Sequence, residues 1–280
     1  MKLLKQLFDF YINSSIHVAL SVFSLTWITL IEFKLPFDVA LLWFVFFATI
    51  TGYNFVKYFG VAKFHHRRLT SRLKAIQVFS FFSFLFLCYY ALQLETKSLV
   101  FVALLGLVTF FYAIPFLPRH FFVDNQQNLR SISGLKVYLI ALIWSGVTVF
   151  LPIVNDSVEI DSDIILTGIQ RFVFIVVLML PFEIRDLQYD NLKLGTIPQK
   201  IGITNTKIMG CVLLLCFVIM EFFKINPTTL FKEVTVLIAI IALLFLVFSK
   251  KIQWKYYSSF LVEGLTILWL VILMVVNYLG

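Results

Sequence analysis

Three carboxylates within eight residues are the feature of this sequence whose type and spacing best suit chemistry. Glu183, Asp186 and Asp190 follow an i, i+3, i+7 pattern, which on a helix places them within about 60° of one another. Like charges on one stripe beside a membrane repel each other, so something must compensate them. A divalent cation that prefers oxygen ligands does so well, particularly Mg²⁺ shared with substrate phosphates. The three residues are therefore candidate magnesium ligands.

A simpler interpretation is that a helix leaving the membrane ends in solvated charges, with Arg185, Lys193 and Lys200 as neighbours. The residues that follow, GTIPQKIG at positions 195–202, argue against it. This stretch contains a glycine, a Thr-Ile-Pro turn and a second glycine, which predict an ordered start of the next helix rather than a flexible loop. This stretch therefore favours a built site.

The elements that position these residues are long apolar runs. Of the 280 residues, 61% are hydrophobic and 14% are charged, against about 45–50% and about 25% in soluble proteins. Runs of about 20 residues recur along the chain, which is the length that a membrane-spanning helix needs. We predict one all-α membrane domain, residues 1–280, with nine transmembrane helices near residues 14–31, 37–57, 75–93, 98–117, 133–154, 164–183, 205–222, 230–249 and 258–278.

The basic residues predict the orientation of this bundle. Of the 23 Lys and Arg residues, 18 fall in connections on the side of the N-terminus and 4 on the opposite side, with Arg171 inside a span. Because basic connections stay in the cytoplasm, we expect a multi-pass protein of the bacterial inner membrane with its N-terminus and acidic stripe cytoplasmic. The same distribution accounts for the net charge of +8, so no nucleic-acid partner is expected.

The acidic stripe also carries a resemblance to a known family. DLQYDNLKLGTIPQKIG, residues 186–202, resembles the second aspartate motif of the UbiA superfamily of intramembrane prenyltransferases, in which a D-x-x-x-D helix leads into a Gly, Thr-Leu/Ile-Pro and Gly turn. Three weaker segments resemble other parts of that family in the same order: RRLTSR (67–72), FYAIPFLPR (111–119) and GLKVYLIALIWSGVTVFLP (134–152). The resemblance covers essentially the whole chain and implies a nine-helix bundle with a cytoplasmic active site.

The chain departs from the family at the first aspartate motif. That motif reads N-D-x-x-D-x-x-x-D at the end of the second helix, where this chain has GYNFVKYFGVAKF. Asn54 matches the Asn, whereas the Asp positions fall on Phe55, Tyr58 and Ala62. In the family, two Mg²⁺ ions bridge a prenyl diphosphate between two acidic helices. This chain keeps one of those helices.

The resemblance implies a role for each candidate residue. Asp186 and Asp190 would hold Mg²⁺, with Glu183 assisting. Lys57 lies one helical turn from Asn54, and ammonium and guanidinium groups bind phosphate directly, so cations are expected to replace the missing metal. The expected contacts to substrate are Lys57, Asn54, Arg67, Arg68 and Lys193 for the diphosphate and Tyr112 for the isoprenoid.

The expected activity is transfer of a prenyl group from its diphosphate to an aromatic or other lipid acceptor. Loss of the first motif leaves a second interpretation, a protein that binds an isoprenoid lipid without turnover. A small-solute transporter is a third, and Arg171 is the residue that raises it. A charge so deep in a span needs a partner, and we expect a structural ion pair with Glu263 or Glu221; a transporter would instead use it in an ion pathway.

Overall fold

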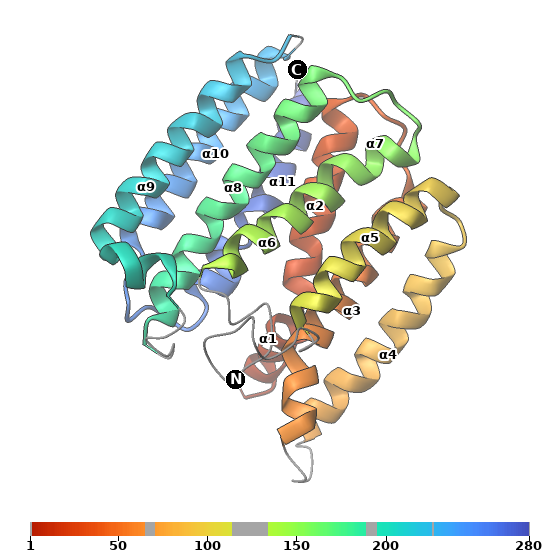
Figure 1. The fold of residues 1–280 in the computed structure, drawn as a ribbon, viewed down its shortest axis with the longest axis vertical. Coiled ribbons are helices and arrows are strands. Elements are labelled where there is room, and N and C mark those ends of the chain that lie inside the picture. The colour runs from red at the N-terminus through yellow and green to blue at the C-terminus, as the bar shows by residue number, and fades with distance from the viewer. Residues whose placement is uncertain (1, 65–70, 114–133, 189–194, 226, 280) are drawn as a thin grey trace, which may run out of the picture.

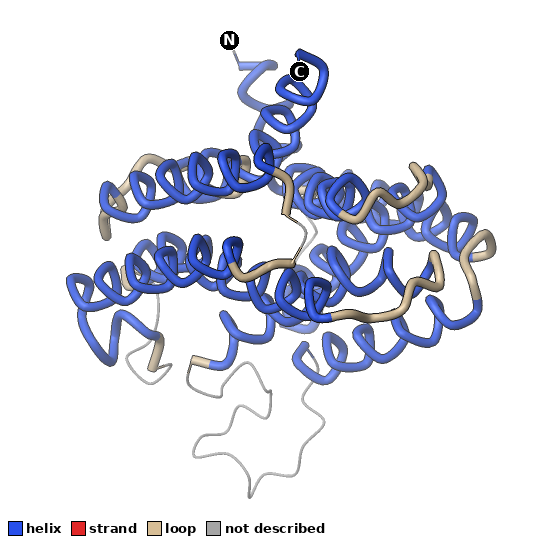
Figure 2. Tube along the Cα trace, turned by 90° about the horizontal axis from the view of Figure 1, so that it is seen from above, coloured by secondary structure: helices blue, strands red, loops and turns tan. Residues whose placement is uncertain are grey.

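The computed structural model describes residues 2–64, 71–113, 134–188, 195–225 and 227–279, and every regular element in these ranges is helical. Figure 2, which colours helices blue, shows these helices joined by loops. In chain order the elements are α1 (Lys2–Asn13), α2 (Ile16–Glu32), α3 (Val39–Phe64), α4 (Ser71–Ala91), α5 (Thr96–Ala113), α6 (Leu135–Ser145), η3 (Gly146–Phe150), α7 (Leu151–Asn155), α8 (Ser162–Asp186), α9 (Ile197–Phe222), α10 (Thr229–Phe248), η5 (Tyr257–Val262) and α11 (Leu265–Leu279).

Within the described residues, each of the nine predicted spans overlaps a helix or a run of consecutive helices. Among the described residues, seven helical segments are long and apolar enough to cross a membrane, and α1 with α2 forms a further pair bent by 53°. The remaining segment, Thr96–Phe111, is apolar but shorter. The prediction of an all-α, multi-pass membrane protein is confirmed. Residues 2–13, which precede the first predicted span, form a helix of their own.

The spans lie side by side, and the last one closes the bundle against the first (Figure 1). α2 packs against α3 and α11, and α8 packs against both α6 and α9. Because the chain alternates in direction, α3, α5, α8 and α10 all end on one side. We call this side the inner end, following the predicted orientation, and the opposite side the outer end.

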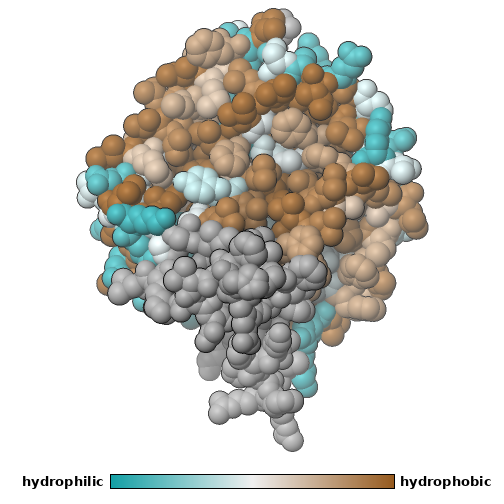
Figure 3. All heavy atoms as spheres, viewed as in Figure 1, coloured by the Kyte–Doolittle hydropathy of each residue, from teal (hydrophilic) through white to brown (hydrophobic). Residues whose placement is uncertain are grey.

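Aromatic side chains fill the middle of the bundle. The ring centroids of Phe174 on α8 and Phe217 on α9 lie 5.0 Å apart, and Trp269 on α11 lies 5.3 Å from Phe174. Gly210 lets α9 approach its neighbours, because an added Cβ would lie 2.3 Å from Leu246. The outside is apolar as well (Figure 3), as expected for a surface that faces lipid.

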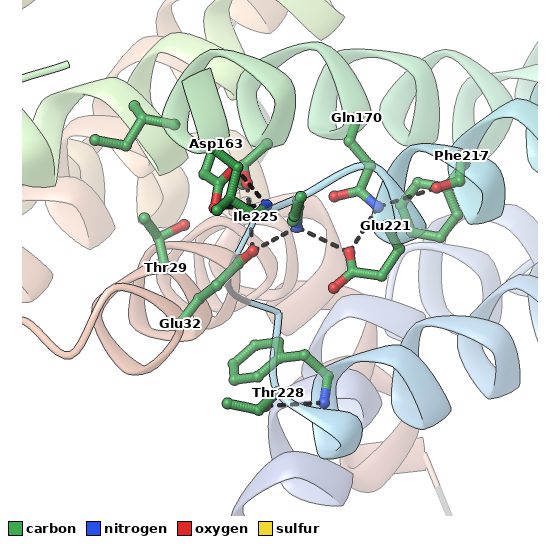
Figure 4. Close-up of polar contacts among 12 residues, drawn as sticks. Thr29, Glu32, Asp163, Gln170, Phe217, Glu221, Ile225 and Thr228 are labelled. Carbon is green, nitrogen blue, oxygen red and sulfur yellow. Dashed lines mark hydrogen bonds and ion pairs between the residues drawn. The ribbon is translucent and has the colours of Figure 1, made fainter. Parts of the chain in front are cut away.

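A buried polar network ties the helices together at the outer end (Figure 4). Lys224 Nζ donates to Glu221 at 2.8 Å and to Glu32 at 2.5 Å, so it joins α9 to α2. Gln170 on α8 donates to the same Glu221 oxygen at 2.9 Å. One ammonium group is therefore shared by two carboxylates where water is scarce.

Arg171 lies within electrostatic range of Glu32 and Glu221 of this network, but among the described residues it forms an ion pair with neither of its predicted partners. The Arg171 guanidinium donates to the Leu25 carbonyl at 3.1 Å and lies 5.3 Å from the Trp269 ring centroid. Glu221 lies within electrostatic range of it, yet bonds Lys224 and Gln170. Glu263, the other predicted partner, lies at the inner end, where α11 begins.

Candidate functional site at the inner end

The bend between α1 and α2 forms a polar hub with Asn54 of α3. Ser15 at the bend has φ of 65° and donates to Asn54 Oδ1 at 2.8 Å. Asn54 Nδ2 donates to the Ser14 carbonyl at 3.0 Å and to Ser80 Oγ on α4 at 2.8 Å. Asn54 is buried, with 3% of its surface exposed. Its amide therefore connects three helices, and a substrate contact would have to share these bonds.

Lys57, one turn along α3, places a cation beside this hub. Its Nζ donates to Ser15 Oγ at 2.9 Å. The residue is exposed, and an ammonium group has three N–H donors. The hub therefore orients Lys57 and leaves N–H groups for a ligand.

The acidic stripe of α8 is compensated by protein cations. Lys136 Nζ of α6 lies 3.4 Å from Glu183 Oε1 and 3.5 Å from Asp186 Oδ2. Arg185 Nη2 lies 2.8 Å from Asp186 Oδ1. Glu183 is buried, whereas Asp186 keeps 20% of its side chain exposed. From the sequence, the carboxylates of the stripe were predicted to bind Mg²⁺. The sequence did not indicate that Lys136 would contact both Glu183 and Asp186.

These described carboxylates do not by themselves fit Mg²⁺. A divalent cation binds oxygen atoms that are free to coordinate it, and here Lys136 bridges Glu183 and Asp186 while Arg185 takes the other Asp186 oxygen. Within the described residues, no group of three or more His, Cys, Asp or Glu side chains could hold a metal ion. Asp190, the other predicted ligand, lies outside the described residues, so the magnesium site stays a prediction.

Several other predicted site residues are also outside the described part of the chain. Arg67, Arg68 and Lys193 belong to the connections 65–70 and 189–194. Tyr112 lies near the end of α5, but its side chain is not described. Of the predicted site residues, the structure therefore places Asn54 and Lys57 in one cluster and Glu183 and Asp186 in a second cluster.

The turn into α9 takes the form predicted from its sequence. Thr196 is the N-cap residue, Pro198 lies in the first turn, and the Thr196 backbone N–H donates to the Gln199 side chain at 3.0 Å. Gly202 has φ of 81° and kinks α9, a conformation that favours glycine. This ordered entry supports the view that the acidic stripe belongs to a built site.

Glu263 is a site residue that sequence reasoning placed in the wrong part of the bundle. It lies directly after η5, within electrostatic range of both Lys57 on α3 and Arg185 on α8. Charges of alternating sign therefore run from Lys57 through Glu263, Arg185 and Asp186 to Lys136. A lone carboxylate in the last apolar run was the signal in the sequence, because ionisable residues in spans are rare and functional.

A pocket of about 410 Å³ lies at the opposite, outer end of the bundle, among residues that include Pro36, Asp38 and Asn155. Its acidic residues suit an anion poorly, and none of the predicted site residues lines it. We therefore place the candidate site at the inner end.

The fold is shared with known membrane proteins of one class. No family model and no curated protein matches the chain. Among solved structures, the chain is similar to a UbiA homolog from Aeropyrum pernix K1 in its apo form, with a TM-score of 0.64 and 13% identity over 94% of this chain and 98% of that chain. It is also similar to a digeranylgeranylglyceryl phosphate synthase, with a TM-score of 0.55 and 14% identity over 98% of this chain and 97% of the other.

These likenesses show that the chain has the UbiA-type fold over nearly its whole length. The resemblance drawn from the sequence is thus confirmed at the level of the fold.

Proposed function

We propose that this protein is an intramembrane prenyltransferase of the UbiA superfamily that acts on a prenyl diphosphate. The observation that carries the proposal is that Lys57 and Arg185, from two different helices, both lie within electrostatic range of Glu263 at the inner end of a UbiA-type bundle. The acceptor is an aromatic compound or another hydrophobic lipid, and the inner end faces the cytoplasm of a bacterial cell.

In this proposal, protein cations bind the anionic head of the donor. Lys57 offers N–H groups beyond the one bonded to Ser15, and Arg185 offers guanidinium donors. Charge-assisted hydrogen bonds of this kind are strong and are well suited to phosphate. As the bond between C1 and the diphosphate oxygen breaks, the leaving group takes the electron pair, and oriented cations stabilise the charge that develops there.

The connections outside the described residues would provide the remaining predicted contacts. Arg67, Arg68 and Lys193 would add positive charge around the diphosphate, and Tyr112 would line the isoprenoid channel. Asp186 and Asp190 would hold Mg²⁺, with Glu183 assisting, as the family resemblance implies. In the structure, Lys136 and Arg185 engage the described carboxylates, so the proposed stabilisation of the leaving group relies on protein cations.

The structure supports a transporter less well than a prenyltransferase, because among the described residues the polar residues do not continue from one end of the bundle to the other. Polar residues surround Arg171 at the outer end, but α8 then continues with the apolar run FVFIVVLMLP, residues 172–181. At 1.5 Å per residue, these ten residues separate the outer network from Glu183 by about 15 Å. Phe174, Phe217 and Trp269 pack together at this level, so an apolar layer divides the two polar ends.

The proposal is tested with purified protein in lipid nanodiscs and radiolabelled farnesyl and geranylgeranyl diphosphates. We expect saturable binding of a prenyl diphosphate and release of inorganic diphosphate, both lost in the double variant Lys57→Met, Arg185→Met. Tight binding without release would instead identify a non-catalytic isoprenoid-binding protein. Absence of both in the wild-type protein would contradict the proposed function.

A further inference from the structure

Glu263 is held at the inner end by an unusual backbone segment. It directly follows the π-helix η5, and its backbone N–H donates to the Ser258 carbonyl, five residues earlier, at 3.2 Å. Its own carbonyl accepts a hydrogen bond from Ser21 Oγ of α2 at 2.9 Å. π-helical segments are rare in proteins. The backbone that carries Glu263 is therefore anchored to a neighbouring span.

The next residue reinforces this anchoring. A Cβ added to Gly264 would lie 2.6 Å from the Phe260 carbonyl oxygen and 3.3 Å from the His17 ring. His17 itself bonds the Phe260 carbonyl at 3.0 Å and the Tyr11 hydroxyl at 2.7 Å. Close packing on α2 thus holds the start of the last span in one place.

The Glu263 carboxylate differs from the other described carboxylates of the inner end. Asp9 forms an ion pair with Lys255, Glu183 forms one with Lys136, and Asp186 forms ion pairs with both Lys136 and Arg185. Within the described residues, the Glu263 carboxylate has neither a hydrogen bond nor an ion pair, although its side chain is only half-buried. Lys57, Arg185 and Tyr11 lie within electrostatic range of it.

An unpaired carboxylate inside a membrane bundle is costly and is by default a functional-site candidate. Lys57 and Arg185 offset part of this cost by electrostatic attraction. The arrangement leaves the carboxylate available to accept a proton, within electrostatic range of the cations that the proposed function assigns to the diphosphate.

Prenyl transfer requires such an acceptor for a proton. The bond between donor C1 and the diphosphate oxygen breaks, and C1 forms a new bond to the carbon or oxygen of the acceptor. That acceptor atom loses a hydrogen as a proton, because the overall reaction converts prenyl diphosphate and H–X into prenyl–X, diphosphate and H⁺. The proton must leave the acceptor whichever acceptor is used, water included.

We propose that Glu263 is the general base that takes this proton. The inference rests on the proposed function and names a catalytic group for it at the start of the last span. The carboxylate receives the proton from the acceptor as the new bond to C1 forms and then releases it to solvent at the inner end.

The test separates breakage of the donor bond from proton removal. Positional isotope exchange follows an ¹⁸O label from the C1–O bridge into other diphosphate oxygens when that bond breaks and re-forms. Product formation is followed with three acceptors: 4-hydroxybenzoate, a glycerol monoether phosphate, and water, which yields the prenyl alcohol. The variants are Glu263→Gln, Glu263→Asp and, as a matched control, Glu233→Gln on the exposed outer part of α10.

We expect Glu263→Gln to bind geranylgeranyl diphosphate within threefold of wild type and to keep isotope exchange. Its product formation should fall by about 10²–10⁴-fold, the usual contribution of general acid–base catalysis. Glu263→Asp should recover part of this loss, and Glu233→Gln should match wild type.

Two results would overturn the role of Glu263. Product formation by Glu263→Gln within threefold of wild type would exclude a base, and parallel loss of donor binding and isotope exchange would assign Glu263 to positioning of the cations. Failure of the wild-type protein itself to bind or cleave any donor would instead refute the proposed function, and the general base with it.

Discussion

Lys136 Nζ lies 3.5 Å from Asp186 Oδ2, so the family-like aspartate of α8 is bonded to a lysine of α6. The same ammonium group lies 3.4 Å from Glu183 Oε1. One cation thus relieves the repulsion between two carboxylates on a single stripe, which the sequence suggested a metal would do. The inner end consequently has a network of fixed charges that does not depend on a bound ion.

The pairing of Lys136 with Asp186 predicts how the affinity for the donor responds to removal of magnesium. We expect the affinity for geranylgeranyl diphosphate to change by less than threefold when EDTA replaces Mg²⁺, because Lys57 and Arg185 supply the positive charge. Equilibrium binding in nanodiscs measures this directly. Loss of binding in EDTA that Mg²⁺ restores would show that Asp186 releases Lys136 and coordinates the metal as the sequence predicted.

Replacement of Lys57 should weaken donor binding without unfolding the protein. Lys57→Met removes the charge of an exposed side chain whose described hydrogen bond goes to Ser15. Hydrogen bonds to charged groups contribute about 1.5–3 kcal/mol, so the dissociation constant should rise by about 10-fold to about 150-fold. Lys250→Met, an exposed lysine at the same end, is the control. Equal effects of the two variants would show that the general positive field, and not Lys57 itself, attracts the donor.

The outer network predicts a stability effect that is separate from activity. Lys224→Met leaves the buried Glu221 and the nearby Glu32 without their shared cation, and breaking a buried pair costs about 3–5 kcal/mol. Thermal unfolding in detergent should therefore shift to lower temperature, whereas Lys232→Met should have little effect. At temperatures where the variant is folded, donor cleavage should match wild type. Loss of donor cleavage in the folded variant would contradict this prediction and would show that the outer network affects the inner site.

The contact of Lys255 with α1 predicts a dependence on pH. The hydrogen bond to Asp9, followed by that to Tyr256, raises the pKa of Lys255 above its ordinary value of 10.5. A cation with a raised pKa stabilises the folded form fully below the ordinary value, and this contribution is lost as the pH rises through the raised value. Because 61% of the Lys255 side chain is exposed, its contribution is at most about 1 kcal/mol.

Hydrogen exchange of α1 measures this contact. Lys255→Met should speed exchange of the α1 amides modestly between pH 6 and 9, with Lys250→Met as control. Unchanged exchange in Lys255→Met would show that apolar packing, such as Phe8 on Tyr256 and Phe260, is sufficient to hold α1.

The sequence predicted the positions of the helices along the chain better than it predicted which face of each helix contacts its neighbours. Apolar runs predicted all nine segments, and the turn chemistry of residues 195–202 predicted the capped entry to α9, because both signals are local. The partners of Arg171 and Asp186 depend on which face each helix turns toward its neighbours. Lys136 lies about fifty positions before Asp186 in the chain, and nothing in the spacing indicates that they meet. The free carboxylate of Glu263 was missed for the same reason.

The most direct test of the account is an electron cryomicroscopy structure of the protein in nanodiscs with geranylgeranyl S-thiolodiphosphate, a donor that resists cleavage. The account predicts phosphate oxygens within about 3.2 Å of Lys57 Nζ and of the Arg185 guanidinium, with the acceptor side of C1 facing Glu263. Diphosphate density anywhere else, including the outer pocket beside Asp38, would contradict it.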